Sequence, residues 1–390
     1  MQVKESAERL FSRRLRRVFY LVMLAVLIGL LVSYWSWVDA QVRAAVVISS
    51  VLEAPILTPA AEAMGGEPGF EDVPVAGNPT LVASPAGDGP WPAIFLVNGA
   101  VREGRKLPEV RNLAEGFARA GYLVVVPDLP GLREARITPQ TAEATTQVAR
   151  EISGRPDVED GQVALVGVST GATLALLAAE DPALRGKVSL IAGVAPYSNI
   201  KTVLSLATTS HYRRSDGELI RYEADSFLTY VTARSLVAAL PPGEDERTLS
   251  EVLERACRKC PDPLSGLRAR RTDDLGPGAR SVVKLLANRN PERFAALYAE
   301  IPDEVRHDLE ELSPLAGTGR IRVPVELATG PRDKYFPPSQ SYALERVAPQ
   351  RRVTVTGALD HAKLEVSPED IPAFATFDAY VVRSLRTARA

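Results

Sequence analysis

The sequence has 390 residues, which is long enough for one large domain that carries an insertion. Hydrophobic residues make up 46% of it and charged residues 24%, and the formal net charge is -2. These values are ordinary for a globular protein. They exclude a nucleic-acid-binding surface built on excess positive charge, and the short basic run at residues 268–271 is expected to be solvated.

A basic segment followed by a long apolar run opens the chain. The uncharged residues 18–38 follow six basic side chains, which are Lys4, Arg9, Arg13, Arg14, Arg16 and Arg17. At about 1.5 Å per residue, this run is long enough to cross a bilayer core of about 30 Å. Tyr34, Trp35 and Trp37 stand at its far end, where aromatic belts occur. The pattern predicts a transmembrane helix with a cytoplasmic N terminus, so the chain after Asp39 is expected to face outward, in an extracytoplasmic location.

Two other interpretations of this segment stay open. Val38-Asp39-Ala40 could serve as a cleavage site, and Ser12-Arg13-Arg14 weakly resembles a twin-arginine signal. The apolar part of a signal peptide usually has about 7 to 15 residues. Residues 18–38 form a longer run, so a retained signal-anchor is favoured, and residues 1–40 are predicted to form the basic segment and the anchor.

Residues 41–69 are predicted to form a juxtamembrane segment and a linker. The largely apolar residues 41–57 are expected to form a short helix near the membrane or against the domain. Residues 58–68 are rich in Ala, Pro and Gly, which indicates a tether.

Strand patterns and helix patterns alternate from Glu71 onward, which is typical of a mostly parallel sheet covered by helices on both faces. The predicted fold class is therefore α/β. Strands are expected at residues 79–83, 93–97, 123–127, 162–166 and 188–192 and near residues 325 and 353, with helices at 110–120, 141–152, 171–179 and 373–387. Ligands of such sheets bind beyond the carboxyl ends of the strands.

A tight turn between one strand and one helix presents a serine in the motif Gly167-Val168-Ser169-Thr170-Gly171. In such a turn the serine takes a strained conformation with positive φ, and the flanking glycines avoid clashes with the neighbouring strand and helix. The serine hydroxyl then stands at a helix N terminus, where unpaired amides and the helix dipole favour a developing negative charge. Ser169 is the predicted nucleophile.

Between Ser198 and Arg320 the strand rhythm stops and helical patterns replace it, as at Asn290-Pro291, a capping residue followed by a proline of the first turn. The alternating domain is therefore expected in two parts, residues 70–198 and 320–390, around a helical insertion at 199–319. Three apolar residues of the insertion are expected to fill its core rather than to line a pocket, and these are Leu204, Phe227 and Leu228.

The two cysteines of the chain lie in this insertion as Cys257-Arg-Lys-Cys260. In a domain that faces outward, a local disulfide is favoured over redox chemistry. A zinc site that includes His211 and His307 is the alternative, but the spacing of these histidines matches no usual ligand pattern. The sequence predicts no metal and no cofactor.

A nucleophilic serine needs a base that takes its proton and a third group that orients the base. The chain has three histidines, and His361 is the one that follows a strand pattern near the C terminus. Asp333 lies in the loop after another predicted strand, so that serine, acid and histidine follow each other at three strand ends. Asp360 and Glu326 are weaker candidates for the acid. The plain alternatives are a turn-capping role for Asp333 and a solvated loop position for His361.

An oxyanion hole needs two amide donors. The amide of Thr170 is one, and the second is expected from Gly99 or Ala100, in the loop after the strand at residues 93–97. Asn98 either adds a side-chain donor or holds this loop as a turn residue.

The chain resembles the α/β-hydrolase superfamily, and within it the capped esterases and dienelactone-hydrolase-like members. Three motifs carry this resemblance, which are Gly167 to Gly171, Gly330 to Asp333 and Leu359 to His361. The resemblance covers roughly residues 70–198 and 320–390. It implies an α/β-hydrolase sheet in which the helical insertion is a cap over the active site. Many members carry His-Gly where this chain has Asn98-Gly99.

The function expected from these residues and this resemblance is that of a membrane-anchored serine hydrolase. It would cleave a carboxylic ester-like bond of a small molecule through an acyl-enzyme on Ser169. A thioesterase, a lactonase, a peptidase or a haloperoxidase could use the same three residues. A hydrolase-fold binding protein without activity is the alternative from another class. No nucleic-acid partner is expected, and the oligomeric state stays open.

Overall fold

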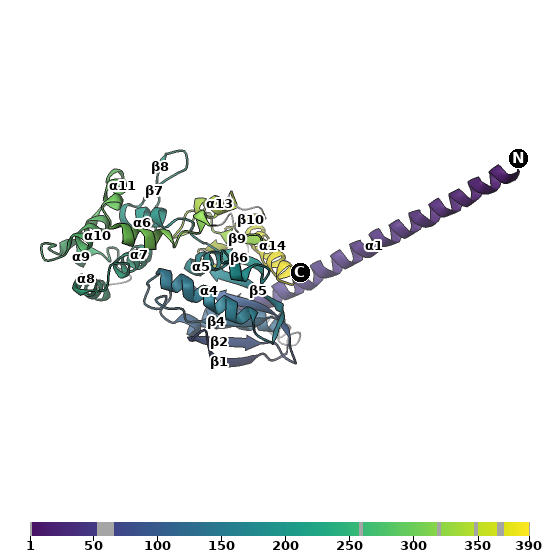
Figure 1. The fold of residues 1–390 in the computed structure, drawn as a ribbon, viewed down its shortest axis with the longest axis horizontal. Coiled ribbons are helices and arrows are strands. Elements are labelled where there is room, and N and C mark those ends of the chain that lie inside the picture. Colours follow the sequence, from purple (N-terminus) through teal and green to yellow (C-terminus); the bar gives the residue numbers. More distant parts are fainter. Residues whose placement is uncertain are drawn as a thin grey trace.

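Eight strands form one central sheet in the computed structural model, which describes residues 2–52, 66–256, 260–317, 321–346, 350–364 and 370–389 (Figure 1). The side chains of residues 2–20, 32, 33 and 316 are outside this description. From one edge to the other, the strands are β1 (Gly69–Val75), β2 (Asn78–Ser84), β4 (Leu123–Pro127), β3 (Trp91–Val97), β5 (Val158–Val168), β6 (Val188–Val194), β9 (Val325–Thr329) and β10 (Arg351–Val355). The pairs β1–β2 and β2–β4 are antiparallel and all the others are parallel.

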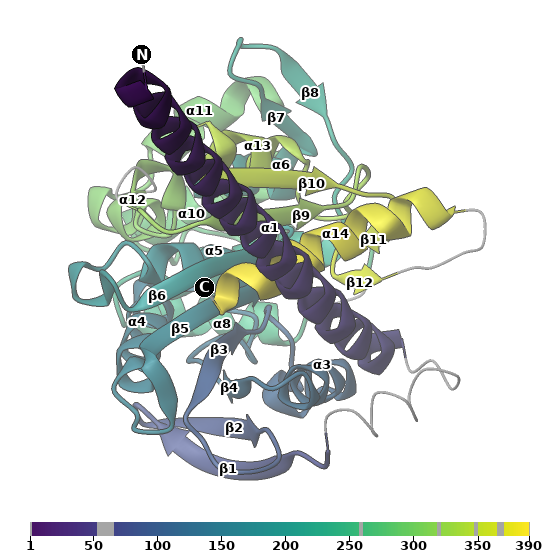
Figure 2. The same cartoon turned by 90° about the vertical axis from the view of Figure 1, so that its right-hand side faces the viewer.

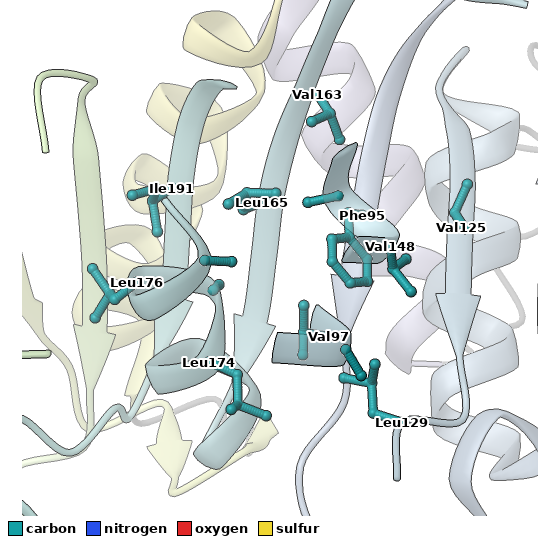
Figure 3. Packing of buried hydrophobic residues seen from close by; sticks show 14 of the residues in the cluster. Phe95, Val97, Val125, Leu129, Val148, Val163, Leu165, Leu174, Leu176 and Ile191 are labelled. Carbon is teal, nitrogen blue, oxygen red and sulfur yellow. The ribbon is translucent and has the colours of Figure 1, made fainter. Parts of the chain in front are cut away.

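Helices cover both faces of this sheet, and central strands such as β3 and β4 are therefore buried on both sides. Successive residues of β3 alternate between two cores, as expected for a strand. Phe95 and Val97 pack on the side of α4 (Pro139–Ser153) and α5 (Thr170–Ala178), shown in Figure 3. Ile94 and Leu96 face the opposite side, where α3 (Pro108–Arg119), α14 (Ile371–Ala388) and the end of α1 (Gln2–Leu52) lie (Figure 2). The α/β fold class predicted from the alternation is confirmed.

A long insertion separates β6 from β9 and has a hydrophobic core of its own. Its helices are α6 (Ile200–Thr209), α7 (Ser226–Ala238), α8 (Glu244–Glu254), α9 (Ser265–Ala269), α10 (Pro277–Ala287), α11 (Pro291–Ala299) and α12 (Asp303–Glu310). Asn290 caps α11 by accepting a hydrogen bond from the amide of Glu292, as its position before a proline predicts. The insertion also holds a hairpin of β7 (His211–Arg213) and β8 (Leu219–Arg221), which the sequence did not predict. Cys260 is disulfide-bonded, and Cys257 lies outside the described residues.

The last strand of the sheet is followed by the short pair β11 (Leu359–Asp360) and β12 (Lys363–Leu364), and α13 (Ser339–Glu345) connects β9 to β10. The loop after β9 and the loop that contains β11 both start at the carboxyl ends of parallel strands. These two loops carry Asp333 and His361.

Helix α1 is one continuous helix from Gln2 to Leu52, and its N-terminal part projects far from the rest of the protein (Figure 1). One stretch of it, Leu21–Leu52, is long and apolar enough to cross a membrane, a test that a signal sequence can also pass. The apolar side chains between Leu21 and Leu31 leave half or more of their surface exposed.

After Ala40 the same helix enters the domain and packs between α3 and α14. A Cβ on Gly116 of α3 would lie only 3.2 Å from the Cα of Val47, so a glycine allows the two helices to approach closely. The Nε2 of Gln41 donates to both carboxylate oxygens of Asp378 in α14, at 2.8 and 3.0 Å. The helix therefore continues past residue 40, and its residues 41–52 lie against the domain, which is one of the two positions expected for this segment. The predicted tether at 58–68 lies mostly outside the described residues.

Candidate active site

Ser169 stands at the junction of β5 and α5 with φ of 56° and ψ of -125°. This strained backbone conformation is rare for a residue with a side chain. It is held by the sheet, because the amide of Ser169 donates to the carbonyl of Val194 in β6 at 2.7 Å. A Cβ on Gly171 would lie 2.0 Å from the carbonyl oxygen of Val97, and one on Gly167 would lie 2.5 Å from the backbone of Ala172. Only glycine fits at these two positions of the turn.

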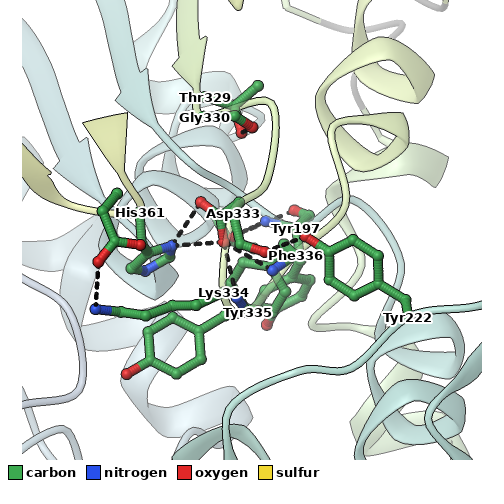
Figure 4. A network of polar contacts seen from close by, with 11 residues as sticks. Tyr197, Tyr222, Thr329, Gly330, Asp333, Lys334, Tyr335, Phe336 and His361 are labelled. Atoms are coloured by element: carbon green, nitrogen blue, oxygen red, sulfur yellow. Dashed lines mark hydrogen bonds and ion pairs between the residues drawn. The ribbon is translucent and has the colours of Figure 1, made fainter. Parts of the chain in front are cut away.

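His361 and Asp333 form a buried hydrogen-bonded pair (Figure 4). The Nδ1 atom of His361 lies 2.9 Å from Oδ1 and 2.8 Å from Oδ2 of Asp333, and the two residues are 4% and 2% exposed. A carboxylate only accepts, so Nδ1 carries the proton and Nε2 of the neutral ring keeps a free lone pair. This is the tautomer in which Nε2 can accept a proton.

The surroundings of this pair hold both side chains in place. Asp333 Oδ1 also accepts hydrogen bonds from the amides of Tyr335 at 2.8 Å and Phe336 at 2.9 Å. The ring of Tyr335 meets the imidazole edge to face with a centroid separation of 4.5 Å, and Phe336 lies at 5.9 Å. Burial raises the pKa of Tyr335 to about 12, so its hydroxyl is neutral near pH 7. The hydroxyl of Tyr222, from the insertion, donates to the backbone carbonyl of Asp333.

Ser169 and His361 line one cavity of about 390 Å³, together with residues of the insertion. No hydrogen bond joins Ser169 to His361 in this structure, which agrees with the loose geometry that such pairs often show before substrate binds. The insertion contributes Phe227 and Leu228 to this cavity, and Leu228 is also part of the core of the insertion. Leu204 is 1% exposed and belongs to the core of the insertion.

The candidate oxyanion donors differ in what they bond. The amide of Gly99 donates to Asn98 Oδ1 at 2.8 Å, whereas the amides of Thr170 and Ala100 have no acceptor within the described residues. Asn98 also donates from Nδ2 to the carbonyl of Gly104 at 3.3 Å, so its side chain holds the loop. A Cβ on Gly99 would lie 3.4 Å from the Cβ of Ser169, which places this loop directly beside the serine.

The other candidate residues lie apart from this pair or have other partners. Asp360 forms an ion pair with Lys334 at 3.2 Å on the wall of the cavity, and Glu326 pairs with Arg383 of α14. Nδ1 of His211 lies 2.7 Å from the carbonyl of Thr209, and His307 is paired with Glu311. Within the described ranges, no group of His, Cys, Asp and Glu is arranged to hold a metal ion.

Sequence reasoning missed the two aromatic residues beside the imidazole and the tyrosine of the insertion that reaches Asp333. Tyr335 and Phe336 directly follow the acid in the motif Asp333-Lys334-Tyr335-Phe336, so their adjacency was a usable signal. Tyr222 lies 111 residues from Asp333, and no local pattern connects them.

Comparisons with known proteins find one family match and several similar solved structures. Residues 79–211, well under half of the chain, match the model of the X-Pro dipeptidyl-peptidase (S15 family). No curated protein matches the sequence. Similar solved structures include a proline iminopeptidase from Mycobacterium smegmatis, with 17% identity over 82% of this chain and 98% of that one and a TM-score of 0.45. An esterase from Pyrococcus furiosus has 13% identity over 84% and 94%, with a TM-score of 0.43.

Esterase B from Lactobacillus rhamnosis has 15% identity over 89% of this chain and 97% of that one, with a TM-score of 0.44. Because all three TM-scores lie below 0.5, nothing about substrate or reaction follows from these likenesses.

The features described above belong together in one enzyme class. The sheet is mostly parallel with helices on both faces, a strained serine follows β5 at a helix N terminus, and the family match spans the strands around it. The protein is a serine hydrolase with an α/β-hydrolase fold, and its residues 79–211 are similar to the X-Pro dipeptidyl-peptidase (S15 family).

Proposed function

We propose that the protein hydrolyses a carboxylic ester-like bond with Ser169 as nucleophile, His361 as base and acid, and Asp333 as the residue that orients the histidine. The observation that carries this proposal is the shared cavity: the serine with positive φ and the imidazole bonded to a buried carboxylate both line it.

The reaction follows from the positions of the protons. Ser169 Oγ attacks the carbonyl carbon and its proton passes to Nε2 of His361, which is bare because Nδ1 donates to Asp333. The oxyanion is stabilised by the amides of Thr170 and Ala100, which have no acceptor among the described residues. The protonated imidazole then gives its proton to the leaving alkoxide. Water, deprotonated by the same nitrogen, attacks the acyl-enzyme and releases the acid.

The apolar N-terminal part of α1 supports a membrane anchor as part of this proposal. The large apolar side chains from Leu21 to Leu31 are exposed in the described protein. A bilayer would cover them. The basic residues before this stretch would keep the N terminus in the cytoplasm and place the hydrolase domain outside.

A peptidase that uses the same residues is the second candidate, because the matching family model describes an X-Pro dipeptidyl-peptidase. A peptidase of that kind must bind a charged amino terminus. The cavity around Ser169 is lined mainly by apolar side chains, and of its two carboxylates Asp360 is paired with Lys334 while Glu109 is exposed in the first turn of α3. An ester therefore fits this cavity better than a dipeptide does.

Replacement of Ser169 tests the proposal. In Ser169→Ala, kcat for a p-nitrophenyl ester should fall on the order of 10⁵-fold or more, by comparison with other serine hydrolases. Ser215→Ala, an exposed serine of the hairpin turn between β7 and β8, is the matched control and should keep the parent rate. If Ser169→Ala cleaves the ester as fast as the parent, the assignment is wrong. A parallel assay with X-Pro p-nitroanilides distinguishes an esterase from a peptidase.

A further inference from the structure

A second cavity adjoins the one that contains Ser169, and the inner end of α1 forms part of its wall. It has a volume of about 130 Å³ and lies between α1, α14 and the sheet. Its lining is apolar except for Ser384 and Tyr380, and the Ser384 hydroxyl already donates to the carbonyl of Tyr380 at 2.9 Å. For comparison, an engineered apolar cavity of about 150 Å³ in another protein stays dry and binds benzene. This space therefore suits hydrocarbon rather than water.

The two cavities share four lining residues, which are Val51, Leu113, Val168 and Ala362. Val168 immediately precedes Ser169 in the chain, and Ala362 immediately follows His361. The common wall is therefore directly beside the reacting groups. A flexible chain attached to a carbonyl carbon at Ser169 could extend past Val51 into the second cavity without leaving apolar surroundings.

The position of this second cavity along α1 relates it to the membrane. Val47 and Ile48 of α1 line it, and the uncharged run ends at Val38 in the same helix. At about 1.5 Å per residue, Val47 lies about 14 Å beyond Val38 along the helix axis, and Val51 lies about 20 Å beyond it. Because α1 is one continuous helix over these residues, the cavity lies within about 20 Å of the point where the uncharged run ends. Figure 2 shows the inner end of α1 beside α3 and α14.

We infer that the substrates are esters of long-chain acyl groups taken from the membrane, and that the second cavity receives the acyl chain. This inference rests on the proposed function. The anchor helix then has two roles, since its inner turns form part of the acyl site. Each methylene that moves from water into the cavity should raise kcat/KM by roughly threefold to fourfold, until the cavity is full.

The test compares a short ester with a long one in the full-length protein. In the parent, kcat/KM should be much higher for p-nitrophenyl laurate than for the butyrate. Val51→Trp fills the common wall and should lower the laurate-to-butyrate ratio at least about tenfold. Ala388→Phe, in a half-buried position of α14 that lines only the second cavity, should lower the same ratio. Ala45→Trp, on the exposed side of α1, is the control and should leave the ratio unchanged.

Either of two results would overturn the inference. One is a ratio within about twofold of the parent in both folded cavity variants, with folding checked by circular dichroism. The other is an equal loss for both esters, which indicates a purely structural role of these positions.

Membrane delivery is tested separately with protein in phosphatidylcholine vesicles. p-Nitrophenyl laurate in the same vesicles should be cleaved faster than p-nitrophenyl laurate in solution, and the opposite order refutes delivery from the membrane.

Labelling of Ser169 separates failure of this inference from failure of the proposed function. The labelling rate is measured with an ethyl and with a dodecyl fluorophosphonate, which require no turnover. A protein that hydrolyses none of the esters but reacts faster with the dodecyl probe, with the preference lost in Val51→Trp, retains the acyl site and refutes the esterase. Equal rates with both probes refute the acyl site.

Discussion

The carboxylate of Asp333 is surrounded by donors. Its Oδ1 accepts from the amides of Tyr335 and Phe336 while both oxygens lie within 2.9 Å of His361 Nδ1. An asparagine at this position could keep both amide bonds through its carbonyl oxygen. Its NH₂ group would then face Nδ1, which must become the acceptor, and the proton would move to Nε2. The imidazole would be in place but in the wrong tautomer.

Asp333→Asn should therefore keep the fold and lose activity. We expect kcat for the ester to fall by about 10³ to 10⁴, by comparison with the same change in a serine protease. Asp360→Asn is the matched control: this carboxylate lies in the same cavity wall, but it is paired with Lys334 and 40% exposed, so its loss should change kcat less than about threefold. A larger effect of Asp360→Asn than of Asp333→Asn would reverse the assignment of the two acids.

The sequence predicted which residues could meet, but not how the oxyanion loop is held. Ser169, Asp333 and His361 each follow a strand of a parallel sheet, and the carboxyl ends of such strands share one edge, so their approach could be foreseen. For Asn98, the sequence left two roles open. The choice depends on the carbonyl of Gly104, which a turn six residues later brings within reach of Nδ2. No propensity argument specifies that geometry.

At the scale of elements, the turn from β5 into α5 is limited by space. The position of a Cβ on Gly171 would be 2.0 Å from the carbonyl oxygen of Val97 and 2.5 Å from that of Asn98, and both are backbone atoms that cannot rotate away. α5 must therefore move off β3 if any side chain is added. This movement would also displace Ser169 and the amide of Thr170.

Gly171→Ala should destabilise the protein by about 3 kcal/mol or more, at the upper end of the usual cost of overpacking. Thermal unfolding followed by circular dichroism measures this as a fall in Tm. Gly243→Ala is the control, because Gly243 has extended backbone and its nearest neighbour to an added Cβ is 3.8 Å away. A Tm of Gly171→Ala equal to that of Gly243→Ala would mean that the turn has more room than the distances indicate.

The elements that the sequence did not predict lack a sequence pattern that marks their bounds. β1 lies at the edge of the sheet and buries only Val75 fully, so its sequence lacks the alternation that indicates a strand. β7 and β8 have three residues each, too few for a period to be visible. In α1 the apolar residues continue from the predicted membrane run into the part that packs on α3 and α14. Apolar character alone cannot distinguish the predicted membrane run from the residues of the same helix that pack against the domain.

At the scale of the whole molecule, the proposed membrane anchor would distinguish this protein from a secreted hydrolase. The mature protein should have the mass of the intact chain, 42.1 kDa, and should stay in the membrane pellet after an alkaline carbonate wash. Leu27→Arg combined with Ile28→Arg should release a large share of it, since one arginine near the centre of a span costs about 2.5 to 3.5 kcal/mol.

Ala45→Arg, on the exposed side of the same helix beyond the span, should leave membrane retention unchanged. An N-terminal sequence that starts at residue 39 or later would contradict the retained anchor and identify residues 1–38 as a signal peptide.

The contact between α1 and α14 joins two helices that lie far apart in the sequence. Gln41 and Asp378 are separated by 337 residues, and Val47 and Tyr380 belong to one core. If α1 is the proposed anchor, it enters the bilayer early in synthesis, whereas α14, which completes its docking site, is translated after all the strands of the sheet. The side of residues 40–52 that packs on α14 stays uncovered until residues 371–388 have been translated, and a chain that stops before residue 371 lacks this contact. In the proposed orientation, quality control on the outer side of the membrane would meet such truncated chains as tethered intermediates with an exposed apolar helix face.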